Sequence, residues 1–180
     1  MGFRKMETKM RHYKYFENVE KNAYYTDTKC QFCGNESNCL EGVFFEKENI
    51  FSICLDCFDK KMVSVEIPDY IKTRVKNNVY EKITDLKFTP PVPWIQNNDW
   101  PVCCDDFMVY IGEWQQIDFD HYADSKSSNG IEVLKELIDS EIAQQVENYK
   151  NLWEEIGNEA GAFAFRCLCC GKIKVIVQEY

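Results

Sequence analysis

The chain has 180 residues, of which 21 are basic and 30 are acidic, so its formal net charge is −9. Apolar side chains make up 45% of the sequence, which excludes an intrinsically disordered protein and predicts a folded core. The acidic balance also disfavours nucleic acid as a partner, because a negative surface repels the phosphate backbone.

Two Cys-x-x-Cys pairs lie in the N-terminal half. Cys30 and Cys33 form the first pair, and Cys54 and Cys57 form the second. Pairs at this separation are typical of a structural zinc site, in which four thiolates surround one Zn²⁺ tetrahedrally. Gly34 supplies the backbone freedom that the turn needs where it leaves the second sulfur. We therefore predict a first zinc ion held by these four cysteines.

Disulfide bonds and a redox couple are the alternatives to zinc. Both are disfavoured, because nothing in the sequence resembles a secretory signal peptide and the surrounding pattern is not a βαβ unit. Ten cysteines in such a chain indicate the reducing cytoplasm, which is where we expect the protein. We expect no membrane span, since the apolar runs are far shorter than the roughly 18 residues that a span needs.

The residues around the first site predict a zinc-ribbon-like hairpin. Short β-type runs at 43–45 and 50–53 flank a polar turn. A short helix is expected to start from the turn of the second pair, in the stretch 58–65. A second helix is expected over 68–79, with Pro68 at a permitted first-turn position.

A proline-rich stretch divides the chain. Residues 88–94 must be extended, because each proline biases its predecessor away from helix. We expect an N-terminal part, 1–87, with the zinc ribbon and short helices, and a C-terminal α+β part, 88–180. The two parts are expected to pack as one compact unit.

The C-terminal part is predicted to contain a strand, a loop and one long helix. The strand is the apolar run 107–112, and the polar segment 117–129 is expected to be a loop. From 131 to 156 apolar residues recur every three or four positions, which predicts a single amphipathic helix of about seven turns. Ser128 or Asn129 can cap its start.

The chain is expected to end in a second Cys-rich hairpin. Two β-type runs, 162–165 and 172–177, flank a Cys-x-x-Cys-Gly turn that begins at Cys167. The same Cys-x-x-Cys-Gly pattern occurs in the turn from Cys30 to Gly34. The overall fold class is therefore α+β, with zinc-ribbon-like hairpins, a long helix and a second zinc hairpin.

We predict a second zinc ion at this hairpin. The preferred ligands are Cys103, Cys104, Cys167 and Cys170. Adjacent residues of an extended chain point to opposite faces, so Cys103 and Cys104 can bind one ion only if residues 101–105 bend sharply. The alternatives replace Cys103 with one of two other side chains, or leave the fourth position to water. Those two side chains are His121 and Cys169.

The remaining features give no positive support for catalysis. Four thiolates form a closed metal site, whereas a hydrolytic zinc keeps an open position and a nearby base. Asp105 and Asp106 are expected to form a solvated acidic turn, and a role as base beside an open zinc is the less favoured alternative. Cys39 has no partner and is expected to be a small buried side chain.

Several ordered motifs carry a resemblance to a known family. They are Cys30-x-x-Cys33-Gly34, Cys54-x-x-Cys57, Thr89-Pro90, Trp94-Ile95-Gln96, Trp100 to Cys104, Asp106 to Gly112 and Phe165 to Gly171. Together they resemble the CbrC family, from about Tyr13 to the C-terminus. Members of that family tend to carry His at the positions of Cys103 and Cys169, and both changes keep a potential metal ligand.

The resemblance implies a zinc-ribbon-like protein associated with tolerance to a DNase colicin. Together with the acidic balance, it favours a non-enzymatic zinc protein whose acidic surface binds another protein, with a basic toxin domain as the candidate. The alternative is a zinc-dependent enzyme with an open second metal site.

Overall fold

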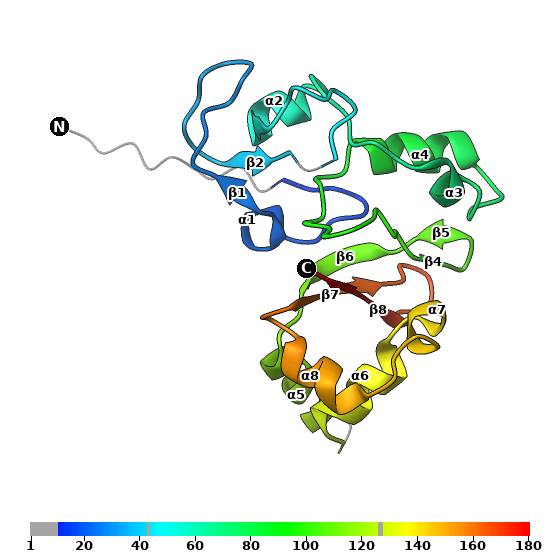
Figure 1. Ribbon diagram of the computed structural model, residues 1–180. Coiled ribbons are helices and arrows are strands. Elements are labelled where there is room, and N and C mark those ends of the chain that lie inside the picture. Colours follow the sequence, from blue (N-terminus) through cyan, green and yellow to red (C-terminus); the bar gives the residue numbers. More distant parts are fainter. Residues whose placement is uncertain (1–10, 43, 126–127) are drawn as a thin grey trace.

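The computed structural model describes residues 11–42, 44–125 and 128–180. These residues form an α+β fold with small antiparallel sheets (Figure 1). The elements of the N-terminal part are α1 Val19–Asn22, β1 Tyr25–Thr26, β2 Cys39–Glu41, β3 Ser52–Cys54, α2 Leu55–Asp59, α3 Asp69–Lys72 and α4 Val79–Lys87. Those of the C-terminal part are β4 Val102–Cys103, β5 Asp106–Phe107, β6 Val109–Glu113, α5 Gln116–Asp124, α6 Gly130–Leu137, α7 Ser140–Ala143, α8 Tyr149–Glu155, β7 Ala160–Arg166 and β8 Ile173–Glu179.

The N-terminal sheet has the strand order β1-β2-β3. The expected strand over 50–53 is present in shifted form as β3, but its partner is β2 and not the predicted run at 43–45. Residue 43 lies outside the described residues, and Phe45 forms an isolated bridge with Val65 instead. Strand β2 is only three residues long, which is too short for an alternating pattern to show in the sequence.

The helices of the N-terminal part also differ from the prediction. Helix α2 starts directly after Cys54 and ends at Asp59, before most of the predicted segment 58–65. The predicted helix 68–79 is reduced to the single turn of α3, and a further helix, α4, follows it. Asn78 has a φ of 51°, a left-handed conformation that Asn tolerates and that interrupts a helix.

The C-terminal sheet has the order β6-β7-β8, so the predicted final hairpin is confirmed. Strand β7 alternates small and aromatic side chains, and both of its faces are buried. Ala160, Ala162 and Ala164 pack with helices α5 to α8. Phe163 and Phe165 face the other side, toward the N-terminal part. The sheet therefore lies between the helices and the N-terminal part (Figure 1).

An aromatic core formed by Trp94, Trp100, Phe163 and Phe165 fills that second side. Trp94 stacks on Phe165 with ring centroids 5.6 Å apart, and Trp100 meets the same ring edge-on at 5.5 Å. The segment 88–94 has no helix or strand, but it is not extended throughout as predicted, because Phe88 has a ψ of 24° and forms a turn at the end of α4. Its Trp94 is only 4% exposed. One buried cluster thus contains residues from both sides of position 88. The division into two parts at this position stays a prediction.

The predicted loop over 117–129 is wrong, because most of it forms helix α5. The main-chain N–H of Gln115 donates to the Asp118 carboxylate at 2.8 Å, which satisfies a donor at the start of the helix. Phe119 and Ala123, four residues apart, are buried on its inner face. The segment was predicted to be a loop because most of its residues are polar, and two buried apolar positions are too few to show a helical period.

The single long helix predicted over 131–156 is also wrong. The segment forms α6, α7 and α8, and Asn129 caps the first of them. The Asp139 side chain accepts a hydrogen bond from the Glu141 N–H, and the Asn148 side chain accepts from the first turn of α8. These side chains begin new helices, because Asp and Asn satisfy the free N–H groups of a first turn. The apolar period continues across both breaks, which is why it predicted one helix.

No helix in the described part of the chain combines the length and the apolar character required to cross a bilayer.

Candidate metal centres

The first cluster begins with a tight turn between β1 and β2. The Gly34 N–H donates to the Cys30 carbonyl at 2.8 Å, and the Cys30 N–H donates to the Asn35 carbonyl at 2.8 Å. Gly34 has a φ of +74°, a left-handed conformation in which a side chain is strained. The turn therefore requires glycine for its backbone angle, and it presents Cys30 and Cys33 on one side.

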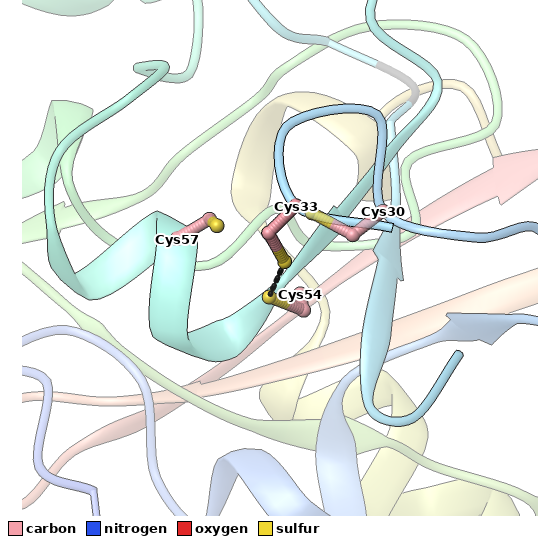
Figure 2. Close-up of side chains that lie close together, drawn as sticks. All are labelled: Cys30, Cys33, Cys54 and Cys57. Carbon is pink, nitrogen blue, oxygen red and sulfur yellow. Dashed lines mark hydrogen bonds between the residues drawn. The ribbon is translucent and has the colours of Figure 1, made fainter. Parts of the chain in front are cut away.

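The other half of the cluster comes from the junction of β3 and α2. Cys54 ends the strand, and Cys57 lies in the first helical turn, so both sulfurs point toward the Cys30 turn (Figure 2). The sulfurs of Cys33 and Cys54 are 3.6 Å apart, and all four sulfurs lie within 4.8 Å of one another. Three of these cysteines are buried and Cys33 is exposed.

These distances fit a metal ion. A tetrahedral zinc with Zn–S bonds of about 2.3 Å separates its sulfurs by about 3.8 Å. A disulfide requires about 2.0 Å, and all ten cysteines of the chain are free thiols. The four side chains that the sequence singled out can therefore hold one metal ion.

The pKa values in the first cluster are set by burial, by main-chain N–H groups and by the neighbouring thiols. Burial raises the pKa of Cys57, and the neighbouring thiols Cys33, Cys54 and Cys30 raise it further. Burial also acts to raise the pKa of Cys30, but main-chain N–H groups at Cys54, Phe32 and Cys33 outweigh it and bring the pKa to about 6. Like charges this close disfavour one another, so a bound cation is needed for all four groups to ionise.

The second cluster contains a turn with the same main-chain hydrogen bonds. The Gly171 N–H donates to the Cys167 carbonyl at 3.0 Å, and the Cys167 N–H donates to the Lys172 carbonyl at 2.9 Å. Gly171 has a φ of +72°. The turn joins β7 to β8, so the final hairpin carries Cys167 and Cys170 at its tip.

The tight turn between β4 and β5 brings the sulfurs of the adjacent residues Cys103 and Cys104 to the same side of the chain. Cys104 and Asp105 are its two turn residues, and their φ values of 52° and 60° are both left-handed. This is the pattern of a type I′ turn, which reverses the chain within two residues. The Cys103 sulfur lies 3.8 Å from that of Cys104 and 3.6 Å from that of Cys170. The sharp bend on which the second site depended is thus present.

Asp105 holds this turn in place. Its carboxylate accepts hydrogen bonds from the main-chain N–H of Lys76 at 2.7 Å and from that of Asn77 at 3.1 Å. The Lys76 N–H is the largest cause that lowers the pKa of Asp105 to about 2, with the Asn77 side chain next. The carboxylate therefore anchors the cysteine turn to the α3–α4 connection. The sequence suggested a solvated acid or a base at this position and carried no signal for that contact.

The sulfurs of Cys103, Cys104, Cys167 and Cys170 lie within 4.8 Å of one another. The alternative ligands are outside this group. His121 lies on α5, and Cys169 is exposed beside the cluster. The pKa of Cys104 is raised, with Cys170 as the largest cause and Cys169 as a smaller one.

The two clusters differ in exposure. In the second, Cys104 and Cys170 are exposed, Cys103 is partly buried and Cys167 is buried. The pKa of Cys170 falls to about 7, chiefly because the Lys172 N–H donates to its sulfur. Cys39, opposite Cys54 in the first sheet, is buried as predicted and is not part of either cluster.

Comparisons with known proteins place the chain at the level of a family. No curated protein and no solved structure shows significant similarity to it. The model of one family matches residues 10–178, which is nearly the whole chain and includes both cysteine clusters. The chain therefore belongs to the Uncharacterised protein family UPF0167, also called the CbrC family.

Proposed function

We propose that the protein binds two structural Zn²⁺ ions and acts, without catalysis of its own, by binding a basic protein. The two groups of four converging thiols carry the metal part of this proposal. Zinc suits them better than harder cations, which prefer oxygen ligands. Four thiolates leave no open coordination position, so each ion would have a structural role.

The proposed role of the zinc ions is to hold small sheets together. Strands β1 to β3 contain two or three residues each, and β4 and β5 contain two. Sheets of this size are marginal without further support. A zinc ion in the first cluster would tie the Cys30 turn to the start of α2, as in a zinc ribbon. Metal binding would then contribute directly to the free energy of folding.

The distribution of charge supports a basic partner. Residues 113–159 contain 12 acidic and 3 basic side chains, whereas the rest of the chain contains 18 of each. The whole net charge of −9 is therefore carried by the segment that includes α5 to α8. Such a surface speeds the encounter with a positively charged partner and repels a negative one. The resemblance to the CbrC family suggests the DNase domain of a colicin as that partner.

The metal part is tested by elemental analysis of protein purified without added metal under reducing conditions. We expect two zinc ions per chain, and one ion after replacement of Cys57 or Cys170 by Ser. Wild-type protein that contains no zinc and stays folded with a chelator would overturn the proposal.

The partner is tested separately with an immobilised colicin DNase domain. We expect binding that weakens as salt is added, because long-range attraction between exposed charges is screened. A lysozyme column serves as a control for unspecific attraction to a basic protein. Equal retention on both columns, or none on the DNase column, would reject this choice of partner.

A further inference from the structure

A groove of about 470 Å³ lies between the α7–α8 connection, α8 and strand β8. Its apolar lining consists of aliphatic side chains from three neighbouring segments. They are Ile142, Val146, Leu152 and Val177. The size is within the range of ligand-binding pockets, and the groove lies inside the acidic part of the molecule.

The charged side chains that line the groove, in the part of the chain that the structure describes, are all acidic. They are Glu147, Glu155 and Glu179, and the other polar lining consists of side-chain amides. Among the described residues, none of these three carboxylates has an ion-pair or hydrogen-bond partner. Asp139 nearby differs, because its carboxylate pairs with Lys174 at 3.0 Å. The groove thus combines an apolar base with unpaired negative charge.

Strand β8 also presents main-chain groups to the groove. It is the outer strand of its sheet, and the Val175 carbonyl accepts a hydrogen bond from the Asp139 N–H at 2.9 Å on the side away from β7. Val177 is two residues further, so its N–H and carbonyl point to the same side, away from β7 and toward the groove that Val177 lines. The Gln96 side chain binds the Glu179 carbonyl at 2.9 Å. Val177 is therefore the position between these two contacts where an added strand can pair.

We infer that this groove receives a Lys or Arg side chain from an extended segment of a basic protein partner. The aliphatic stem of the side chain would lie on the apolar base while its cationic head reaches the carboxylates. The main chain of the segment would pair with Val177, as in strand addition to a sheet edge. The inference rests on the proposed function, since it assigns the docking site and its chemistry to the acidic surface.

Two adjacent glutamines provide a matched test. Gln145 lines the groove and Gln144 does not, although both side chains are exposed. Each donates to a carbonyl four residues earlier, at 3.1 Å for Gln144 and 3.4 Å for Gln145. Gln145→Lys therefore places a competing cation in the groove. Gln144→Lys makes the same change in net charge and loses a similar contact.

The probe is a fluorescent synthetic peptide in which lysine and threonine alternate, with a glutamate–threonine peptide as the negative control. Fluorescence anisotropy gives the affinity, and amide chemical shifts map the site. We expect Gln145→Lys to weaken binding by about tenfold or more relative to Gln144→Lys, because like charges oppose each other in the groove. Equal affinities of the two variants, no binding to wild type, or shifts confined to other surfaces would overturn the inference.

A second comparison uses substitutions that remove charge without adding bulk. The variant Glu147→Gln, Glu155→Gln, Glu179→Gln is paired with Asp27→Asn, Glu20→Gln, Glu41→Gln, which changes the net charge equally at exposed sites outside the groove. We expect only the first to lose peptide binding. Equal losses would indicate a general charge effect and reject the groove.

The same variants separate this inference from the proposed function. If Gln145→Lys abolishes peptide binding while wild type does not bind the colicin DNase domain, the groove is supported as a cation-binding site and the colicin DNase domain is rejected as the partner. If the DNase domain binds wild type and Gln145→Lys equally, the proposed function stands and the groove is rejected.

Discussion

The main-chain N–H of Lys76 donates a hydrogen bond of 2.7 Å to the carboxylate of Asp105, which lies 29 positions later in the turn that carries Cys104. This contact joins the α3–α4 connection to the second cysteine cluster. Cys104 and Asp105 both have left-handed backbone angles, which non-glycine residues adopt at a cost. The hydrogen bonds to Asp105 favour that conformation and so help to keep the sulfurs of Cys103 and Cys104 close enough together to bind one ion.

We predict that Asp105→Ala lowers zinc affinity at the second site by about ten- to hundredfold, a range typical for residues that position metal ligands. The alanine loses the hydrogen bonds to Lys76 and Asn77 and disfavours a positive φ. Competition with a chromophoric chelator measures the affinity. Asp105→Asn is the control, because Asn tolerates the left-handed region and retains one acceptor oxygen. Equal affinities of wild type and Asp105→Ala would contradict the positioning role.

The different exposure of the clusters predicts the order in which zinc is lost. A chelator should remove one ion first from the second site, where Cys104 and Cys170 are exposed. The ion of the first site should leave later, since Cys30, Cys54 and Cys57 are buried and release requires the local sheet to open. Native mass spectrometry follows the two steps over time.

Single-site variants assign each step of zinc release. Cys170→Ser should remove the fast step and leave the slow one, and Cys57→Ser should do the reverse. Release of both ions at one rate, or a slow step that disappears in Cys170→Ser, would show that exposure does not control the order.

The sequence predicted the parts of these sites that depend on neighbouring residues. The turns at Cys30 and Cys167 depend only on residues within the Cys-x-x-Cys-Gly motif and the one after it. The motif includes the glycine whose positive φ each turn requires. The bend at Cys104 and Asp105 has no such local signal, because neither is glycine and the stabilising N–H groups come from residues 76 and 77. The spacing of residues in the sequence cannot predict a contact between segments this far apart.

The helical region shows a similar limit. The apolar period over 131–156 correctly indicated one buried face, but it continues through the breaks. The local signals for those breaks were Asp139 and Asn148, two good N-cap residues that also occur on exposed helix surfaces. A parallel bridge between Ile138 and Val175 then fixes the first break. That bridge joins residues far apart in the sequence, so the period alone could not reveal it.

The burial of Trp94 predicts that the segment 88–94 contributes to stability. Trp94→Ala should reduce the free energy of unfolding by about 3–5 kcal/mol, as for other large aromatic side chains removed from a core. Trp94→Phe should cost clearly less, because a ring remains against Phe163 and Phe165. Urea unfolding with saturating zinc measures both variants. Losses below about 1 kcal/mol for Trp94→Ala would place this segment outside the core.

The ion pair of Asp139 and Lys174 predicts a dependence of stability on pH. Burial acts to raise the pKa of Asp139, but Lys174 and the Glu141 N–H outweigh it and hold the pKa below its usual value. A carboxyl group whose pKa is lowered by folding stabilises the protein above its unfolded pKa of about 3.9. That contribution is lost as the pH falls through the lower pKa of the folded state.

Asp139→Asn should therefore be less stable than wild type by about 0.5–1 kcal/mol at neutral pH, since Asn keeps the cap but loses the ion pair. The difference should shrink as the pH falls below about 4. Urea unfolding of both zinc-loaded proteins measures this difference, and comparison at the same pH cancels the acid release of metal, which both proteins share. Lys135→Gln serves as the control, because Lys135 pairs with Glu132 on an exposed helix face and should contribute less. A difference between Asp139→Asn and wild type that grows toward low pH would reverse the sign argued here and exclude the ion pair as its source.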